Sequence, residues 1–254
     1  MFQAYSMKKS TVVNANDVTD LKDKYLCVFC RAEVTLKAIN CPKTRPHFAK
    51  LPSIPHIDCP CNLFGSVSEN ITGYEKFDIS DILNNSPLSI KSDKHSNNNN
   101  NRSKNASEAI ERISTPKRLL KYCLSHDINS EYKDGILICD VCLDTRNILA
   151  NNNYNGFDGI RLVVGKTIMY FDDKDQRYFT FIVNNLSNKS KTLTAKVNVS
   201  KEQIIDIRNY IFNTYQKFSL HPIAVLGEWT KTGDNTIECT VTRPANVIYR
   251  FANE

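Results

Sequence analysis

The stretch SKEQIIDIRNYIFNTYQKF, residues 200–218, decides the fold expected for the second half of the chain. Ser200 is a good helix cap, and Ile204, Ile207 and Ile211 recur at the spacing of one helical face. The sequence therefore predicts a single amphipathic helix here, which needs an apolar partner on one side.

Segments typical of β-strands flank this helix. Three lie before it, at 160–171, 178–184 and 192–199, and two lie after it, at 221–229 and 236–251, separated by a turn at Gly233-Asp234. Three strands, a helix and two strands is the order of an OB-type five-stranded barrel, a fold that often holds oligonucleotides. We therefore expect an α+β, mostly β chain with an OB-like barrel, preceded by a helix that begins near Pro116 with Ser114 or Thr115 as its cap.

A polar tract divides the chain. Residues 84–107 are dominated by asparagine, serine and lysine, so this tract has almost nothing to bury and cannot offset the entropy lost on ordering. We predict a flexible linker there, with a zinc-binding, zinc-ribbon-like module at 1–83 and a helix plus barrel domain at 108–254. Of the 254 residues, 41% are hydrophobic and 24% are charged, which is typical of a soluble globular protein.

The nine cysteines of the chain indicate a metal rather than disulfides. The start of the sequence has no apolar core of a secretory signal, and no stretch is long and apolar enough for a membrane span, so we expect a cytoplasmic protein with reduced thiols. Five prolines between positions 42 and 60 exclude a long helix from the cysteine-rich segment. A segment with so small an expected core needs a stabilising cross-link, and a bound zinc ion is the natural one.

Cys27 and Cys30 form a C-x2-C knuckle, which brings two thiolates to one ion from a tight turn. Zinc requires four ligands in a tetrahedron, so a second pair must come from later in the chain. His47 and Cys59 are the best candidates. The last position stays open among Cys59, His56, Cys61 and Cys41.

The same segment resembles the zinc-finger module of the competence protein CoiA-like family over about residues 25–61. The resemblance rests on the knuckle, on the strand-like Glu33–Lys37 and on Arg45-Pro46-His47-Phe48-Ala49-Lys50. It implies that Cys27, Cys30, His47 and Cys59 are zinc ligands. Lys50 stands where that family usually has a second histidine, and the acidic-lysine core of the family's nuclease domain is not found after Cys61. The resemblance thus supports a closed structural zinc site more than cleavage.

A second set of residues also has zinc-like spacing. Cys123-x2-His126 and Cys139-x2-Cys142 are separated by a connection of suitable length. However, Leu119, Leu120 and Cys123 share one apolar helical face, so the competing interpretation is an ordinary buried core.

Basic and aromatic residues alternate through the predicted barrel, as in proteins that bind single strands by stacking bases over a basic groove. The net charge of +6 is compatible with such a polyanionic partner. We therefore expect a zinc-containing accessory protein without catalysis of its own that binds single-stranded DNA or RNA. The alternatives are an adaptor subunit of a larger protein complex and, third, a divergent CoiA-like nuclease. The candidate contacts are Arg161, Lys166, Tyr170, Arg177, Tyr178, Lys231, Arg243 and Arg250.

Overall fold

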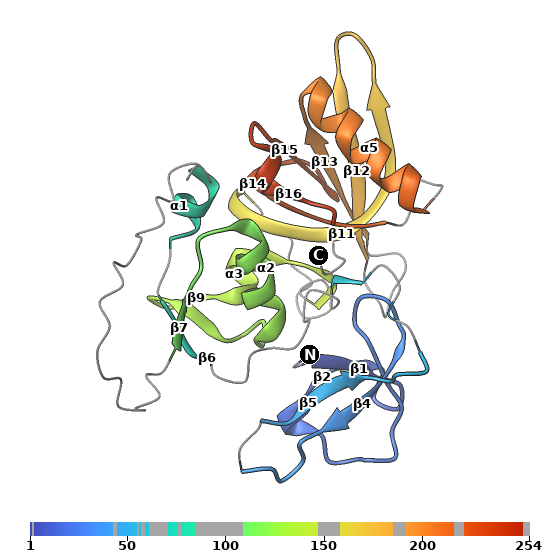
Figure 1. The fold of residues 1–254 in the computed structure, drawn as a ribbon, viewed down its shortest axis with the longest axis vertical. Coiled ribbons are helices and arrows are strands. Elements are labelled where there is room, and N and C mark those ends of the chain that lie inside the picture. The colour runs from blue at the N-terminus through green and yellow to red at the C-terminus, as the bar shows by residue number, and fades with distance from the viewer. Residues whose placement is uncertain are drawn as a thin grey trace, which may run out of the picture.

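The computed structural model describes residues 1, 3–42, 45–54, 56, 59–60, 71–75, 78–84, 109–146, 158–184, 192–215 and 221–250. Strands predominate, and a few helices accompany them. Figure 1 shows the arrangement: a small N-terminal sheet (blue), a region built around two helices (green), and a barrel (yellow to red). The N-terminal sheet and the barrel are separate layers of strands, and the α2–α3 region lies beside both.

The barrel is closed by five strands: β11 (Gly159–Asp172), β12 (Arg177–Asn184), β13 (Thr192–Asn198), β14 (Pro222–Gly233) and β15 (Thr236–Thr240). Their order around the barrel is β11-β12-β13-β15-β14, and β14 pairs back to β11 through the register from Gly159↔Trp229 to Lys166↔Pro222. Only β13 and β15 are parallel; the other neighbours are antiparallel. Short strands β10 (Cys142–Leu143) and β16 (Val247–Ile248) extend the sheet beside β11 and β14.

Alternation along the strands explains why this barrel closes. Phe179, Phe181 and Val183 of β12 are fully buried and point inward, whereas the residues between them are only half-buried. Helix α5 (Lys201–Tyr215) adds its isoleucines at 204, 207 and 211 to the same core. It begins with a reciprocal capping pair: the Gln203 amide donates to Ser200 Oγ over 3.3 Å, and the Ser200 amide donates to Gln203 Oε1 over 2.8 Å.

The N-terminal sheet is antiparallel throughout and has the order β2-β1-β3-β4-β5. Its strands are β1 (Gln3–Ser6), β2 (Thr11–Asn14), β3 (Tyr25–Leu26), β4 (Glu33–Lys37) and β5 (His47–Lys50), and a 3-10 turn, η1 (Ala15–Asp17), follows β2. Phe48 and Tyr25 pack together with ring centroids 5.2 Å apart. Because these side chains and Val34 are buried, the segment has an apolar core that its sequence did not indicate.

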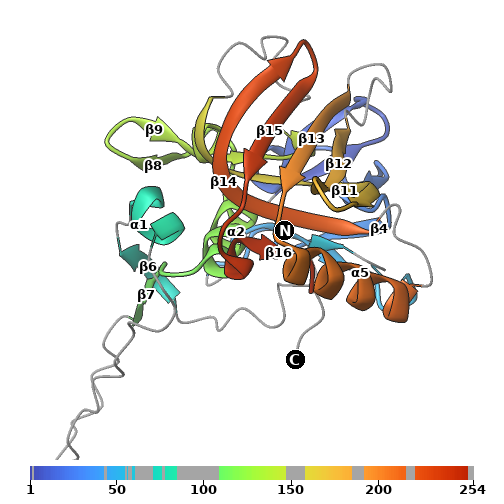
Figure 2. The ribbon, with the colours of Figure 1, turned by 90° about the horizontal axis from the view of Figure 1, so that it is seen from above.

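Helix α2 (Pro116–Ser125) is the centre of the middle region. Thr115 caps it, as one of the two expected caps, by accepting a hydrogen bond from the Arg118 amide. The other elements here are β8 (Glu131–Lys133), β9 (Ile136–Leu137), α3 (Ile138–Val141), α1 (Ile79–Asn84) and the parallel pair β6 (Ile71–Glu75) and β7 (Ala109–Arg112). In both views α1, β6 and β7 lie on the side of the molecule opposite α5 (Figure 2).

Strand β11 is the shared wall between two hydrophobic cores. Val163 points into the barrel, while its neighbours Leu162 and Val164 point outward into a second core. That second core also contains Cys27 and Cys59 of the N-terminal region, together with α2 and α3. The cysteine-rich segment therefore packs on the outside of the barrel wall.

Polar contacts join the N-terminal sheet to the α2 region as well. Arg146 is 2% exposed and forms a bidentate ion pair with the fully buried Asp144, with its shortest contact at 2.7 Å. The same guanidinium donates to Gln3 Oε1 of β1 and to the carbonyl oxygens of Cys123 and His126. One buried side chain thus ties β1 to the end of α2.

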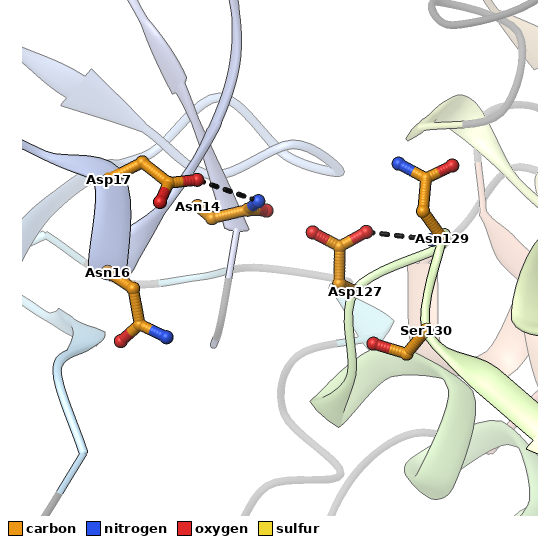
Figure 3. Close-up of a pocket in the computed structure, with 6 residues that line it drawn as sticks. All are labelled: Asn14, Asn16, Asp17, Asp127, Asn129 and Ser130. Carbon is orange, nitrogen blue, oxygen red and sulfur yellow. Dashed lines mark hydrogen bonds between the residues drawn. The ribbon is translucent and has the colours of Figure 1, made fainter.

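A polar cavity of about 410 Å³ lies at the same junction (Figure 3). Its two carboxylates are already engaged: Asn14 Nδ2 donates to Asp17 Oδ2 over 3.0 Å, and the Asn129 amide donates to Asp127 Oδ1 over 2.7 Å. Gln3 Nε2 bridges the two sides by donating to Asn14 Oδ1 and Asp127 Oδ2. The cavity therefore belongs to the contact between these two parts of the chain.

The expected mixed, mostly β fold with a five-stranded barrel is confirmed. The strand predicted at 236–251 is interrupted: β15 ends at Thr240, and the 3-10 turn η4 (Pro244–Asn246) separates it from β16. Pro244 cannot donate an amide proton to a sheet, which is consistent with a break there. Residues 85–107 of the predicted linker lie outside the described residues, and Asn84 ends α1. No helix in the described ranges is long and apolar enough to cross a membrane.

Candidate metal centre

Four side chains of metal-ligand type meet where the N-terminal sheet packs toward the barrel. The ligand atoms of Cys27, Cys30, His56 and Cys59 all lie within 4.8 Å of one another. Cys27 and Cys59 are fully buried, His56 is 5% exposed, and Cys30 is half-buried. A buried set of three thiols and one imidazole could hold a metal ion.

The turn after β3 places the first two ligands. The Cys27 amide donates to the Ala32 carbonyl over 2.8 Å, and the Arg31 amide donates to the Cys27 carbonyl over 3.0 Å. Arg31 has φ of 64°, a left-handed conformation that reverses the chain directly after Cys30. The knuckle therefore presents Cys27 and Cys30 from the same side of one tight turn.

The distances between the sulfur and nitrogen atoms fit a tetrahedral ion. Cys27 Sγ lies 3.6 Å from Cys59 Sγ, and Cys30 Sγ lies 3.4 Å from His56 Nδ1. Zinc bonds of about 2.3 Å to sulfur and about 2.0 Å to nitrogen, at tetrahedral angles, separate two sulfurs by about 3.8 Å and a sulfur from a nitrogen by about 3.5 Å. These two distances match the spacing around one ion of this size, and the other ligand atoms lie within 4.8 Å of one another.

The thiols of Cys27 and Cys30 also affect the protonation of His56. Hydrogen bonds to Cys27 and Cys30 raise the pKa of His56 to about 9, against the opposing effect of burial. A positive imidazolium beside sulfur is the arrangement expected when no ion occupies the site. A bound metal would take the place of that proton, since it binds thiolates and neutral imidazole.

Three of the four predicted ligands, Cys27, Cys30 and Cys59, are in this group, and the histidine is His56 rather than His47. His47 begins β5 opposite Lys37, with Nδ1 3.0 Å from the Arg45 carbonyl oxygen. The next residue, Phe48, occupies the buried face of that strand, so His47 points the other way. The structure therefore places His47 outside this group.

The structure distinguishes two of the remaining alternatives for the last ligand. Cys41 is exposed and is not in the group, and Cys61 lies outside the described residues. A signal for His56 was present in the sequence: His56-x2-Cys59 has the same spacing as Cys27-x2-Cys30. Pairing these two knuckles would have selected the observed set.

The second zinc-like set does not assemble. Cys142 is hydrogen-bonded to Cys123, which together with burial holds its pKa well above the usual range of a thiol. Cys139 is only half-buried, and His126 Nδ1 lies 2.8 Å from the Tyr122 carbonyl oxygen. Within the described ranges, the group formed by Cys27, Cys30, His56 and Cys59 is the one in which three or more ligand atoms come together.

Two of the residues predicted to contact nucleic acid are neighbours at the start of β12, where Tyr178 lies on the outer face and Arg177 on the opposite one. Arg177 pairs with Asp172 at 3.2 Å, and Tyr178 stacks on Phe171 with ring centroids 5.2 Å apart and an angle of 18° between the rings. Lys196 of β13, which was not among the predicted residues, lies 4.7 Å from the centroid of the Tyr178 ring. Cross-strand pairing explains this cluster, because Phe171 is opposite Tyr178 in the register.

The other six predicted contacts lie elsewhere. Arg161 is half-buried beside α3, Lys166 lines a cavity, and Tyr170 packs against Phe212 of α5. Arg243 donates to the Leu83 carbonyl oxygen, and Arg250 lies beside Asp206. Lys231 is exposed near the end of β14. The structure therefore does not gather the predicted set into one surface.

Comparison with protein families and with curated proteins identifies no relative of this chain. No protein-family model matches the chain, and a search of curated proteins finds no match.

Proposed function

We propose that this protein binds single-stranded DNA or RNA on the outer face of β12 and β13, and that zinc at Cys27, Cys30, His56 and Cys59 stabilises the region packed against the barrel. The order of three strands, a helix and two strands supports an OB-type interpretation of the barrel. In that fold the face of the second and third strands binds oligonucleotides.

The stacked pair Phe171–Tyr178 is the observation that carries this proposal. Phe171 is 38% exposed, so part of its ring is open to a ligand. A base can stack on such a ring whatever its identity, and Lys196 beside Tyr178 supplies a positive charge for the backbone. The pair therefore has the chemistry of a platform for a single strand.

Zinc is the metal that the ligands favour. Thiolates are soft ligands, and three of them with one imidazole is a common structural zinc set in a reducing compartment such as the cytoplasm. Four protein ligands leave no open position for a substrate or an activated water. We therefore assign the ion a structural role and the protein no catalysis of its own.

Binding of labelled single-stranded DNA and RNA, measured by fluorescence anisotropy at two salt concentrations, tests the proposal. Binding should weaken as salt rises, because phosphate contacts release counterions. Phe171→Ala should cost about 1–3 kcal/mol of binding free energy, the value of one base–aromatic stack. Phe212→Ala is the matched control, since Phe212 is also 38% exposed but lies on α5. Absence of binding at low salt, or equal losses in the two variants, would reject the proposal.

A protein partner is the second candidate, because three exposed apolar side chains gather at the end of β11. Ile168, Met169 and Phe171 are 40%, 47% and 38% exposed. An adaptor would use this surface to dock onto a larger assembly. Pull-down of the full chain with and without nuclease treatment distinguishes the two: an adaptor keeps its partner after nuclease treatment and loses it in Met169→Asp.

A further inference from the structure

A cavity of about 200 Å³ lies between residues next to the candidate metal ligands and the outer wall of the barrel. On the metal side its walls are formed by direct sequence neighbours of the ligands: Phe29 and Arg31 flank Cys30, and Pro60 follows Cys59. On the barrel side they include Lys166 of β11 and Ile182 of β12. A metal that fixes the ligands would therefore also fix one wall of this cavity.

The lining has a distinct chemistry. Arg31 and Lys166 contribute positive charge, and no acidic residue is among the described residues that line the cavity. The other side chains are chiefly apolar, including Phe29, Val164 and Ile182. Such a lining suits a ligand with one anionic group and one flat apolar group. The volume is below the roughly 300–1,000 Å³ of sites for drug-sized ligands, so a ligand of nucleotide size would lie partly outside the cavity.

The cavity lies at one end of the surface proposed to bind a single strand. Ile182 and Tyr178 are both on the outer side of β12, four positions apart. At about 3.3 Å per residue, this separation is roughly 13 Å along the strand. A nucleic acid that stacks on Phe171 and Tyr178 and follows β12 would reach the cavity.

We propose that this cavity binds one nucleotide of the strand, with its phosphate beside Arg31 and Lys166 and its base against Phe29 and Ile182. The inference rests on the proposed function and adds the position and chemistry of a second contact. Arg31 is already held in place, since its guanidinium lies 4.5 Å from the centroid of the Tyr5 ring. The metal centre then acts on binding by positioning the wall that carries Arg31.

Two substitutions test the phosphate contact without disturbing the fold. Lys166→Met removes a charge and keeps a long side chain. Arg31→Gly removes the guanidinium from a residue whose φ of 64° glycine adopts freely. Lys117→Met is the matched control, because Lys117 is exposed on α2 and does not line the cavity.

The probes are uridine and adenosine 5′-monophosphate, titrated calorimetrically into the full chain, with the two nucleosides and inorganic phosphate for comparison. A nucleotide should bind more tightly than its nucleoside or than phosphate alone. Lys166→Met and Arg31→Gly should each weaken nucleotide binding by about ten-fold or more, as loss of a hydrogen bond to a charged group does. Lys117→Met should match the unaltered protein, and a single-stranded oligonucleotide should displace the mononucleotide.

The outcomes separate the two proposals. If oligonucleotides bind but mononucleotides do not, or if both cavity variants bind mononucleotides as the unaltered protein does, the cavity assignment is overturned and the proposed function stands. If mononucleotides bind and no oligonucleotide does, the proposed function is overturned, and with it the placement of a strand in this cavity.

Discussion

The Sγ atoms of Cys27 and Cys59 lie 3.6 Å apart in the interior, although 32 positions separate the two residues in the sequence. Holding them together closes a long loop, and a metal that binds only the folded arrangement stabilises it by its binding free energy. The apolar core around these thiols also includes α2 and the outer side of β11. Loss of the metal should therefore affect more than the knuckle itself.

The two histidines of the N-terminal region should differ in their effect on metal binding. His56→Ala removes a proposed ligand and should lower zinc affinity strongly, whereas His47→Ala should leave it unchanged and shift stability by no more than about 0.5 kcal/mol. Competition with a chromogenic chelator measures both affinities. If His47→Ala released zinc and His56→Ala did not, the proposed ligand set would be wrong.

Gly165 should be essential to the barrel because β11 and β12 approach closely there. A Cβ atom at Gly165 would lie 2.3 Å from the Ile182 carbonyl oxygen, which is backbone and cannot turn away. Gly165→Ala should cost about 1–3 kcal/mol in the free energy of unfolding, the usual cost of overpacking. Gly233→Ala is the control, since its nearest contact would be an ordinary 3.5 Å. Urea unfolding of both variants checks the difference, and equal stabilities would refute it.

The buried ion pair should be far more sensitive to losing one partner than to losing both. Asp144→Ala leaves the Arg146 guanidinium uncompensated at 2% exposure and should cost about 3–5 kcal/mol. Replacing both residues with apolar side chains, Asp144→Leu with Arg146→Met, should cost less than the single change. Thermal unfolding compares the three proteins. A double variant less stable than Asp144→Ala would show that the hydrogen bonds of Arg146 to Gln3 and to two carbonyl groups dominate.

Glu238 should restrain nucleic-acid binding. Its carboxylate lies 3.3 Å from Lys196 Nζ, beside the proposed stacking platform, and competes with phosphate for that charge. Glu238→Gln should raise affinity by up to about five-fold, the range of an exposed ion pair. The slope of log affinity against log salt should steepen by about 0.7, as expected for one added phosphate contact. Anisotropy titrations at several salt concentrations provide the check, and an unchanged slope would argue against phosphate at Lys196.

The same carboxylate should contribute a pH dependence to stability. A hydrogen bond from Asn198, and next the interaction with Lys196, lowers the pKa of Glu238 from its ordinary value of 4.5. A lowered pKa in the folded protein means that the stabilisation is present above pH 4.5 and is lost as pH falls through the folded-state value. Unfolding curves between pH 7 and pH 3 should therefore show a smaller acid-induced loss in Glu238→Gln than in the unaltered protein. Identical losses would contradict this reading.

The barrel could be predicted because its signals are local. Alternation at Phe179, Phe181 and Val183 places one face of β12 inside, and the isoleucines of residues 200–218 specify the covering helix. Each strand and turn could be read without knowing its neighbours in space. The boundaries were less predictable: the strand expected at 221–229 continues to Gly233, and the one expected at 236–251 is interrupted by η4.

The metal group could be predicted only in part, because its last members depend on tertiary contact. The spacing of Cys27 and Cys30 is local, but the choice between His47 and His56 depends on which one the fold brings to Cys30. The ion pair between Asp144 and Arg146 had no sequence signal, since such pairs are common on surfaces. The sequence also did not predict the core that contains both Cys27 and Leu162, because no local pattern indicates a contact between distant segments.

Native mass spectrometry of the full chain, purified without added metal and measured before and after chelation, tests the central claim most directly. The account predicts one zinc ion per chain in the unaltered protein, removed by the chelator together with a large fall in melting temperature, and no zinc in Cys59→Ser. A metal-free chain whose melting temperature the chelator leaves unchanged would contradict it.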